Sequence, residues 1–237
     1  MPRVVVFDEF GGPDVMHVVE EPAPAPGAGE VRVRIEAFAV NPLDQMMRSG
    51  TAPVTVPLPH ARLGVEGTGV IDALGAGVTG LATGAPVILT AIPDASVRGS
   101  YAEYTTVPAS RVVARPAGLG IAEAAAIWVA YSTAYGALVE KARMRPGDHV
   151  LITAASGGVG RAAMQIASQL GAVPIAVTRH TAKKDDLLAA GAAAVIATRL
   201  GALRPAIGKV FALDDIAEAH RHLEQGLHAG KKIVVRV

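Results

Sequence analysis

A glycine-rich loop between an apolar segment and an amphipathic one constrains the fold of this chain more than any other feature. Residues 149–154 are apolar nearly throughout, which is typical of a parallel strand buried on both faces. Residues 161–170 place apolar side chains on one face at helical spacing. The same alternation continues with a strand over 173–177, a helix over about 181–190 and a strand over 194–198. The sequence therefore predicts a β-α-β-α-β unit with a parallel sheet.

The loop consists of Ala155 followed by Ser156, Gly157, Gly158, Val159 and Gly160. Glycines allow the backbone to approach a pyrophosphate, and the helix that begins near Arg161 directs its free N–H groups and the positive end of its dipole at that group. The alternative is a tight structural turn. Because a strand precedes the loop and a helix and a further βα unit follow it, we interpret the loop as a dinucleotide-binding site.

The end of the second strand distinguishes between the two nicotinamide dinucleotides. An NAD site needs a carboxylate about 20 residues past the glycines, where it holds the ribose 2′-hydroxyl. This region instead runs from Thr178 through Arg179 to Lys183 and Lys184, and the first acid is Asp185. A guanidinium at Arg179, helped by a lysine, suits a 2′-phosphate, whereas the alternative is a solvated basic start of a helix. The sequence therefore predicts NADPH as the cofactor, bound in part by Thr178, Arg179 and Lys183.

The chain before this unit is typical of a β-rich domain. Residues 31–37 alternate apolar and charged side chains, as a strand with one wet face does. Further strands are expected at 69–74, 86–90, 101–107 and 111–114. Beyond Pro116 the remaining expected elements are helices over 121–128, 133–141 and 213–225 and a last strand over 233–237.

Composition excludes several classes of function. Lys and Arg number 22 against 21 Asp and Glu, so the net charge of +1 gives no electrostatic case for nucleic acid or an anionic membrane as the partner. With 51% apolar and 18% charged residues, the chain is not a disordered one. The absence of cysteine excludes a thiolate nucleophile, a disulfide framework and cysteine-ligated zinc. No stretch of about 18 uninterrupted apolar residues occurs, and we expect a soluble, cytoplasmic α/β protein.

Six segments resemble the motifs of one protein family, in the family's order and over nearly the whole chain. They lie at residues 39–50, which contain Asn41-Pro-Leu-Asp44, and at 64–70, 99–104, 130–135, 145–151 and 230–234. On these segments the chain is similar to the medium-chain dehydrogenase/reductase superfamily, specifically its zinc-independent quinone oxidoreductase and enoyl reductase branch. The resemblance implies an α/β fold with two domains: a GroES-like β-rich substrate domain over 1–117 and 208–237, and a Rossmann dinucleotide-binding domain over 118–207.

The Rossmann domain is expected to be truncated to three parallel strands, where the family has six. After the strand at 194–198 the sequence passes through 199–203 directly to residues 204–208, which in the family follow the sixth strand. About eighty to ninety residues, the second half of the doubly wound sheet, are therefore missing from the pattern. The resemblance implies that the site for adenosine and pyrophosphate remains, whereas contacts to the nicotinamide ribose and ring are in doubt.

The resemblance implies an NADPH-dependent oxidoreductase that reduces a conjugated carbonyl, such as a quinone, an enone or an enoyl thioester, by hydride transfer. It places Asn41 and Asp44 in the active-site cleft, Thr133 at the nicotinamide amide and Tyr131 as a proton donor or oxyanion partner. Two of these have structural alternatives, because Asn41 precedes a proline as in many turns and Thr133 can satisfy a helix terminus. No metal is expected, since a valine precedes Glu66 where the zinc-dependent relatives have a histidine.

Two other classes of function remain open. A cyclase or isomerase could keep the cleft of the β-rich domain without redox chemistry, with Asp44, Glu66 and Tyr131 as general acid or base. A ligand-binding or regulatory protein could reuse the scaffold as well. The glycine loop and Arg179 favour the reductase, whereas the missing half-domain favours the alternatives.

The missing half-domain also predicts an association. The strand at 149–154 would be central in a complete sheet, so here it should form an edge of unpaired N–H and C=O groups without a proline or lysine to protect it. We expect the same edge of a second copy to pair with it antiparallel about a two-fold axis, giving a six-stranded sheet in a homodimer. A helix or the 199–208 connection lying over the edge is the alternative. A small-molecule substrate is the other expected partner.

Overall fold

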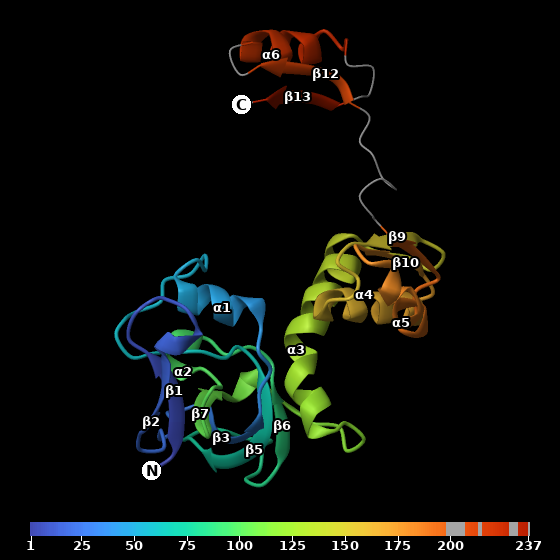
Figure 1. Cartoon of the computed structure of the whole chain (residues 1–237). Coiled ribbons are helices and arrows are strands. Elements are labelled where there is room, and N and C mark those ends of the chain that lie inside the picture. Colours follow the sequence, from blue (N-terminus) through green and yellow to red (C-terminus); the bar gives the residue numbers. More distant parts are fainter. Residues whose placement is uncertain (198–206, 213–214, 228–231, 237) are drawn as a thin grey trace. The chain divides into compact units, whose positions relative to one another are not determined.

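The computed structural model describes residues 1–197, 207–212, 215–227 and 232–236 (Figure 1). The chain divides into two compact units, Met1–Met144 and Arg145–Val237. The sequence placed a domain boundary after residue 117, whereas the contacts divide the chain later, because helix α3 (Ile121–Tyr135) packs against the larger sheet of the first unit. The assignment of residues 208–237 to the β-rich domain stays a prediction.

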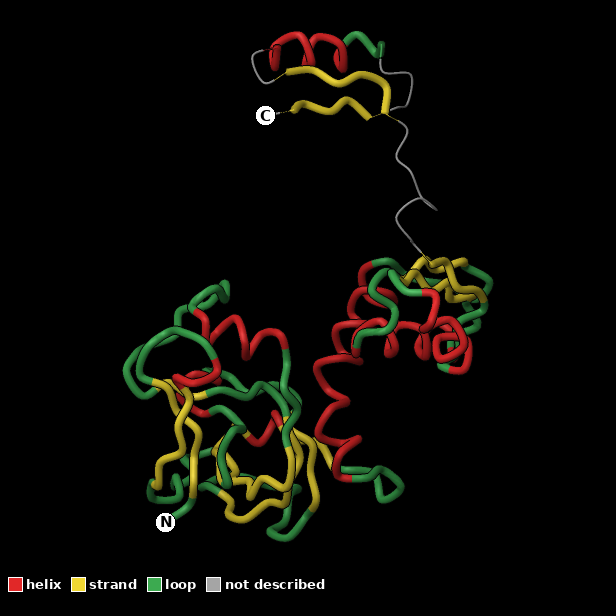
Figure 2. The backbone as a smooth tube through the Cα atoms, viewed as in Figure 1, coloured by secondary structure: helices red, strands yellow, loops and turns green. Residues whose placement is uncertain are grey.

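The first unit contains two antiparallel sheets (Figure 2). The larger has the order β7-β3-β5-β6-β8. Its strands are β3 (Glu30–Ala37), β5 (Gly67–Leu74), β6 (Pro86–Leu89), β7 (Tyr104–Pro108) and β8 (Val112–Ala114). The smaller has the order β2-β1-β4, with β1 (Arg3–Phe7), β2 (Met16–Glu20) and β4 (Ala61–Arg62).

The alternation expected for residues 31–37 is confirmed in β3. Val31 and Val33 are fully buried in the core of the larger sheet, while Arg32 and Arg34 lie on the opposite face of the strand. A period of two with one apolar face is what an antiparallel sheet with one wet side requires.

Residues 101–103 connect the two sheets through backbone hydrogen bonds. The Val5 N–H donates to the Tyr101 carbonyl at 2.8 Å, and the Glu103 N–H donates to the Arg3 carbonyl at 2.9 Å. On the other side, the Ile35 N–H donates to the Glu103 carbonyl at 2.9 Å. This short segment therefore joins β1 to β3, which belong to different sheets.

Short helical elements complete the first unit. They are α1 (Pro42–Ser49), α2 (Ala95–Arg98) and the 3-10 turns η1 (Pro13–Val15) and η2 (Ala109–Arg111). The helix expected over 133–141 is divided, because α3 ends at Tyr135 and the π-helical turn η3 (Gly136–Lys141) follows. The change of helix type falls at a glycine, which is a weak helix former.

The second unit begins with the expected β-α-β-α-β arrangement. Its elements are β9 (His149–Ile152), α4 (Gly158–Gln169), β10 (Val173–Thr178), the 3-10 turn η4 (Thr181–Lys183), α5 (Lys184–Ala189) and β11 (Ala194–Ala197). The strands are parallel, in the order β11-β10-β9. The truncated three-stranded parallel sheet and the α/β class are thus confirmed. Helix α4 begins at Gly158, three residues before the expected start near Arg161, so two of the loop glycines lie in its first turn.

A separate β-α-β element follows. Strand β12 (Ile207–Ala212), helix α6 (Ile216–Glu224) and strand β13 (Lys232–Arg236) form a parallel two-stranded sheet with its crossover helix. Among the described residues, no helix has the length and apolar character that crossing a bilayer requires.

Strand β9 is not buried on both faces, and that part of the sequence prediction is wrong. Ile152 and its register neighbour Ala176 of β10 are buried, whereas Leu151 is 60% exposed. Helix α4 packs against β9 and β10, and α5 packs against β11. The buried face carries these crossover helices, so alternate residues of β9 differ in exposure.

Candidate functional site

The glycine loop of the second unit has the geometry of a phosphate-binding turn. Ala154 has a left-handed backbone with φ of 49°, and Gly157 caps α4 in an extended conformation. The first N–H groups of a helix have no partner within the helix, so those of α4 point out of its N-terminus. A Cβ atom at Gly160 would lie 2.6 Å from both the Ala154 oxygen and the Ala155 Cα, so only glycine allows the helix to approach the strand this closely.

A cavity of about 490 Å³ lies beside this loop, at the carboxyl ends of β9 and β10. The predicted residues that line it are Ser156, Gly157, Thr178, Arg179 and Lys183. Gly158, Val159 and Gly160 stand in the first turn of α4 and are not among the lining residues. In open parallel sheets ligands bind at this end of the strands, so the position of the cavity is that of a ligand site.

The charges around the cavity favour an anion. The Lys183 Nζ donates to the Ser156 Oγ at 3.2 Å, and Arg179 is exposed without an ion pair among the described residues. The nearby acid Asp186 is held by an ion pair with Arg161. Two cationic side chains therefore remain available to a phosphate group.

Thr178 and His180 complete the wall at the end of β10. Thr178 is buried, and its hydroxyl accepts the His180 N–H at 3.3 Å. His180 lines the cavity and was not among the residues that the sequence singled out. Its position directly after Arg179 in a basic stretch was the signal that could have identified it.

In the first unit, the structure brings Asn41 and Asp44 together at the start of α1. The Asn41 N–H donates to Asp44 Oδ2 at 2.8 Å, and the Gly64 N–H donates to Asp44 Oδ1 at 3.0 Å. Asp44 is 2% exposed, and its burial raises its pKa while the N–H groups of Asn41 and Gly64 oppose that rise. Both carboxylate oxygens are therefore committed to backbone groups, which favours a structural role over proton transfer.

Tyr101 lies beside this carboxylate. Its ring is buried, and its hydroxyl has no hydrogen-bond partner at good geometry among the described residues. Burial, followed by the charge of Asp44, raises the pKa of the Tyr101 hydroxyl. Tyr101 therefore keeps its hydroxyl proton beside the Asp44 carboxylate.

The Asn41 side chain turns toward a second buried carboxylate. The Asn41 Nδ2 donates to Glu66 Oε1 at 2.9 Å. Tyr131 is half-buried and Thr133 is exposed on α3, in the same unit as Asn41. The cleft roles of Asn41, Asp44, Tyr131 and Thr133 stay predictions.

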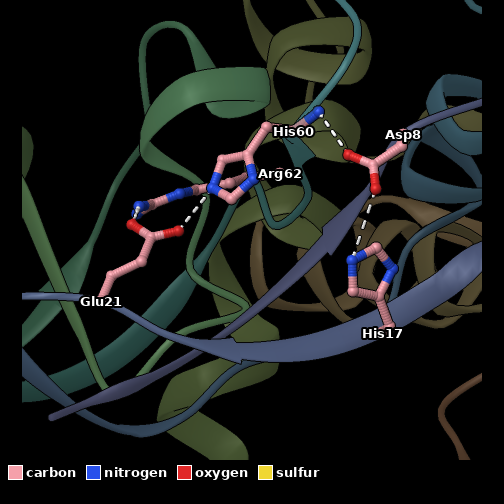
Figure 3. Close-up of polar contacts among 5 residues, drawn as sticks. All are labelled: Asp8, His17, Glu21, His60 and Arg62. Carbon is pink, nitrogen blue, oxygen red and sulfur yellow. Dashed lines mark hydrogen bonds and ion pairs between the residues drawn. The ribbon is translucent and has the colours of Figure 1, made fainter.

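His60 lies in a polar cluster on the smaller sheet (Figure 3). Its Nε2 is 2.5 Å from Glu21 Oε1, and Glu21 also pairs with Arg62. The His60 N–H donates to Asp8 Oδ1 at 2.9 Å, and Asp8 Oδ2 is 3.5 Å from His17 Nε2. These contacts join β2 and β4 to the end of β1, and His60 itself has a left-handed backbone with φ of 68°. The cluster therefore gives His60 a structural role at this turn.

Comparison with known proteins agrees with this architecture. The family model described as "Alcohol dehydrogenase GroES-like domain" matches residues 27–117, and the one described as "Zinc-binding dehydrogenase" matches residues 120–235. Together with the fold and the loop geometry, these matches define a protein with a GroES-like part and a Rossmann-type part. The chain belongs to the medium-chain dehydrogenase/reductase superfamily, in its quinone oxidoreductase-like branch.

Individual relatives show how much of the family the chain retains. The quinone oxidoreductase of Lama guanicoe is 39% identical over 166 residues, which cover 70% of this chain and 49% of that protein. The crystal structure of a Pseudomonas syringae quinone oxidoreductase is 31% identical with a TM-score of 0.78, covering 98% of this chain and 64% of that chain. Escherichia coli quinone oxidoreductase complexed with NADPH is 28% identical with a TM-score of 0.74, over 98% and 64%. The chain spans about half the length of the curated relatives it matches.

Proposed function

We propose that this protein is an NADPH-dependent oxidoreductase that reduces a conjugated carbonyl compound, such as a quinone, an enone or an enoyl thioester. The observation that carries the proposal is the cavity at the carboxyl ends of β9 and β10, where the N-terminus of α4 lies beside Arg179 and Lys183. A helix N-terminus suits a pyrophosphate, and paired cations suit a 2′-phosphate. The relative from Escherichia coli that was solved with NADPH supports this cofactor class.

NADPH, when bound, supplies the hydride that adds to the β-carbon of the substrate. The residues of this chain would bind and orient it: the first N–H groups of α4 would hold the pyrophosphate, and Arg179 and Lys183 would hold the 2′-phosphate. Thr133 on α3 is the candidate for the nicotinamide amide. Tyr131 is the candidate that gives a proton to the developing enolate or stabilises its oxygen, and Asn41 is a candidate for the lining of the cleft.

We propose that the reaction needs no zinc. One matching family model carries a zinc-binding description, but a matching name does not supply ligands. Among the described residues, no group of three or more His, Asp or Glu side chains is placed to hold a metal ion. With no cysteine in the chain, the sulfur ligands of zinc are lacking as well.

Cofactor titration tests the proposal. We expect NADPH to quench the fluorescence of the protein and to bind more tightly than NADH. Arg179→Ala should weaken the binding of NADPH by about 1.5–3 kcal/mol and leave the binding of NADH nearly unchanged, because only NADPH has the 2′-phosphate. Arg145→Ala is the control, since Arg145 is an exposed arginine of the same unit that does not line the cavity.

Turnover is then followed by the loss of nicotinamide absorbance with a quinone or an enone. An equal loss of NADPH and NADH affinity in Arg179→Ala would show that Arg179 is only a surface residue. If NADPH does not bind at millimolar concentration, the proposal fails, and a cyclase, an isomerase or a ligand-binding protein becomes the better assignment.

A further inference from the structure

Glu66 is a buried carboxylate that the proposed function does not use. It directly precedes β5 and is 1% exposed. Its Oε1 accepts the Asn41 Nδ2–H at 2.9 Å, and its Oε2 accepts the Val129 N–H of α3 at 2.9 Å. Its backbone carbonyl accepts the Ser100 Oγ–H at 2.6 Å. One residue thus connects the start of α1, the middle of α3 and Ser100, which directly precedes the segment that joins the two sheets.

A carboxylate in this place is costly. Glu66 forms no ion pair with any cation among the described residues, and its two oxygens have only neutral donors. Burying a charge without a counter-ion opposes folding, and an apolar side chain of similar volume would avoid that cost. An acid at this position therefore points to a task that an apolar residue cannot perform.

The contacts of Glu66 favour a positioning role over proton transfer. Each of its two side-chain oxygens accepts an N–H group of another residue. The side chain is also almost fully buried, so no substrate atom reaches it. Glu66 acts through the groups that it holds.

The carboxylate determines which end of the Asn41 amide faces it. An amide can turn its oxygen or its nitrogen toward a neighbour, and the hydrogen-bond partners decide between the two. Because the carboxylate only accepts, the Asn41 nitrogen must face Glu66. The other oxygen of Glu66 fixes Val129, which lies four residues before Thr133 on the same side of α3 and two residues before Tyr131.

We infer that Glu66 is a positioning residue, which sets the polarity that Asn41 presents and holds the turn of α3 that carries Tyr131 and Thr133. This inference rests on the proposed function, because Asn41, Tyr131 and Thr133 are the candidate groups at the reacting end of the site. It explains why an acceptor stands between the Asn41 side chain and the Val129 N–H, both of which are donors.

Glu66→Gln is the sharpest test, because it keeps the shape and changes one acceptor into a donor. The Val129 N–H cannot reverse, so the glutamine oxygen should stay with it and the glutamine nitrogen should face Asn41. The Asn41 amide must then rotate and offer its oxygen. We expect the Asn41 side-chain signal in a ¹H–¹⁵N spectrum to move, while the Val129 amide stays protected from exchange. We expect kcat/KM to fall about 10- to 100-fold, with the KM for NADPH changed less than about twofold.

A double variant separates positioning from stability. In Glu66→Gln with Asn41→Asp, the glutamine nitrogen donates to one aspartate oxygen, and the other oxygen points away from residue 66, as the Asn41 oxygen does in the wild type. The two variants should have similar unfolding midpoints, because Asn41 in Glu66→Gln also pairs by turning its amide, whereas kcat/KM should recover only in the double variant. Ser100→Ala is the matched control, since it removes the bond to the Glu66 carbonyl and should leave the Asn41 signal in place.

An unmoved Asn41 side-chain signal in Glu66→Gln would overturn the inference, as would turnover at the wild-type level. A kcat/KM in the double variant that stays at the level of Glu66→Gln, with equal unfolding midpoints, would also overturn it. If the wild-type protein shows no turnover with NADPH, the proposed function fails, and the Asn41 signal still decides whether Glu66 sets the amide.

Discussion

The two units of the molecule differ in the burial of the charged side chains discussed above. In the first unit, the carboxylates of Asp44 and Glu66 are buried and accept hydrogen bonds from N–H groups at both oxygens. In the second unit, Arg179 is exposed beside a cavity, and Leu151 on the edge strand is 60% exposed. In the first unit these two carboxylates therefore find their donors within the unit, whereas in the second unit the cation and the apolar side chain are exposed. Two units that differ in this way should respond differently to the same kind of change.

The largest effect is expected at the glycine loop of the second unit. In Gly160→Val the new side chain collides with the backbone of Ala154 and Ala155, which cannot move without separating α4 from the strand. We expect a loss of about 3 kcal/mol or more in the stability of this unit and no measurable NADPH binding. Hydrogen exchange followed by mass spectrometry should show the loss in 145–197 and unchanged protection in the first unit.

Gly136→Ala is the matched control for that substitution. A Cβ at Gly136 meets no atom within 4 Å, and its backbone conformation is helical. This variant should keep both its stability and its NADPH binding. Equal protection of the two units in Gly160→Val would contradict the comparison.

A somewhat smaller effect is expected when the first unit loses a buried acceptor. Asp44→Ala leaves the N–H groups of Asn41 and Gly64 without a partner, which should lower the free energy of unfolding by about 2 kcal/mol. Urea denaturation measures this loss of stability. Hydrogen exchange should show that the loss is confined to the first unit. Gln45→Ala is the control, because Gln45 is an exposed neighbour on the same helix. A loss spread over both units would show that they do not fold independently.

The edge of the second unit provides the third test. We expect the protein to be a dimer through β9, and Leu151→Lys should raise its dissociation constant at least about tenfold, because a charge is then placed at the centre of the shared edge. The exposed Leu151 is a better probe than the buried Ile152, whose replacement would damage the contact with α4. Leu188→Lys, at a 39% exposed leucine on α5, is the control. A wild-type monomer by light scattering, with rapidly exchanging amides along β9, would refute the dimer.

The smallest expected effect is on the pH dependence of the first unit. The Arg98 side chain and then the Gly27 N–H lower the pKa of Glu30 below 4.5. The carboxylate therefore adds stability above about pH 4.5, and this contribution is lost as the pH falls through the lowered value. Glu30→Gln should flatten the stability profile in that acidic window by less than about 1 kcal/mol and leave the second unit unchanged. Acid unfolding curves with the same slope as wild type would contradict this.

The sequence predicted local elements well, because their patterns have short periods. The alternation in β3, the β-α-β-α-β order of the second unit and the glycine at position 160 all follow from residues within one element or its neighbour. The lining of the cavity by Ser156, Arg179 and Lys183 follows from the rule that parallel strands end at the same edge.

Contacts between residues that are far apart in the chain could not be predicted from the sequence. The bond between Glu66 and the Val129 N–H joins residues that are 63 positions apart, and no local pattern marks it. The exposure of Leu151 depends on which faces of the sheet carry helices, whereas the apolar composition of its strand indicated burial on both sides. The early start of α4 at Gly158 was missed because glycine is a poor helix former in general but is favourable where a backbone must approach another.

During synthesis, the two sheets of the first unit can join only after residues 101–103 have been made. The β1–β2 hairpin is local, but the backbone hydrogen bonds that join β1 to β3 through residues 101–103 cannot form until that segment has left the ribosome. The strands of the second unit find their partners within a short stretch of the chain that follows. The nascent protein therefore exposes unpaired strand edges until residues 101–103 have emerged, and partly folded chains with such edges are prone to aggregate.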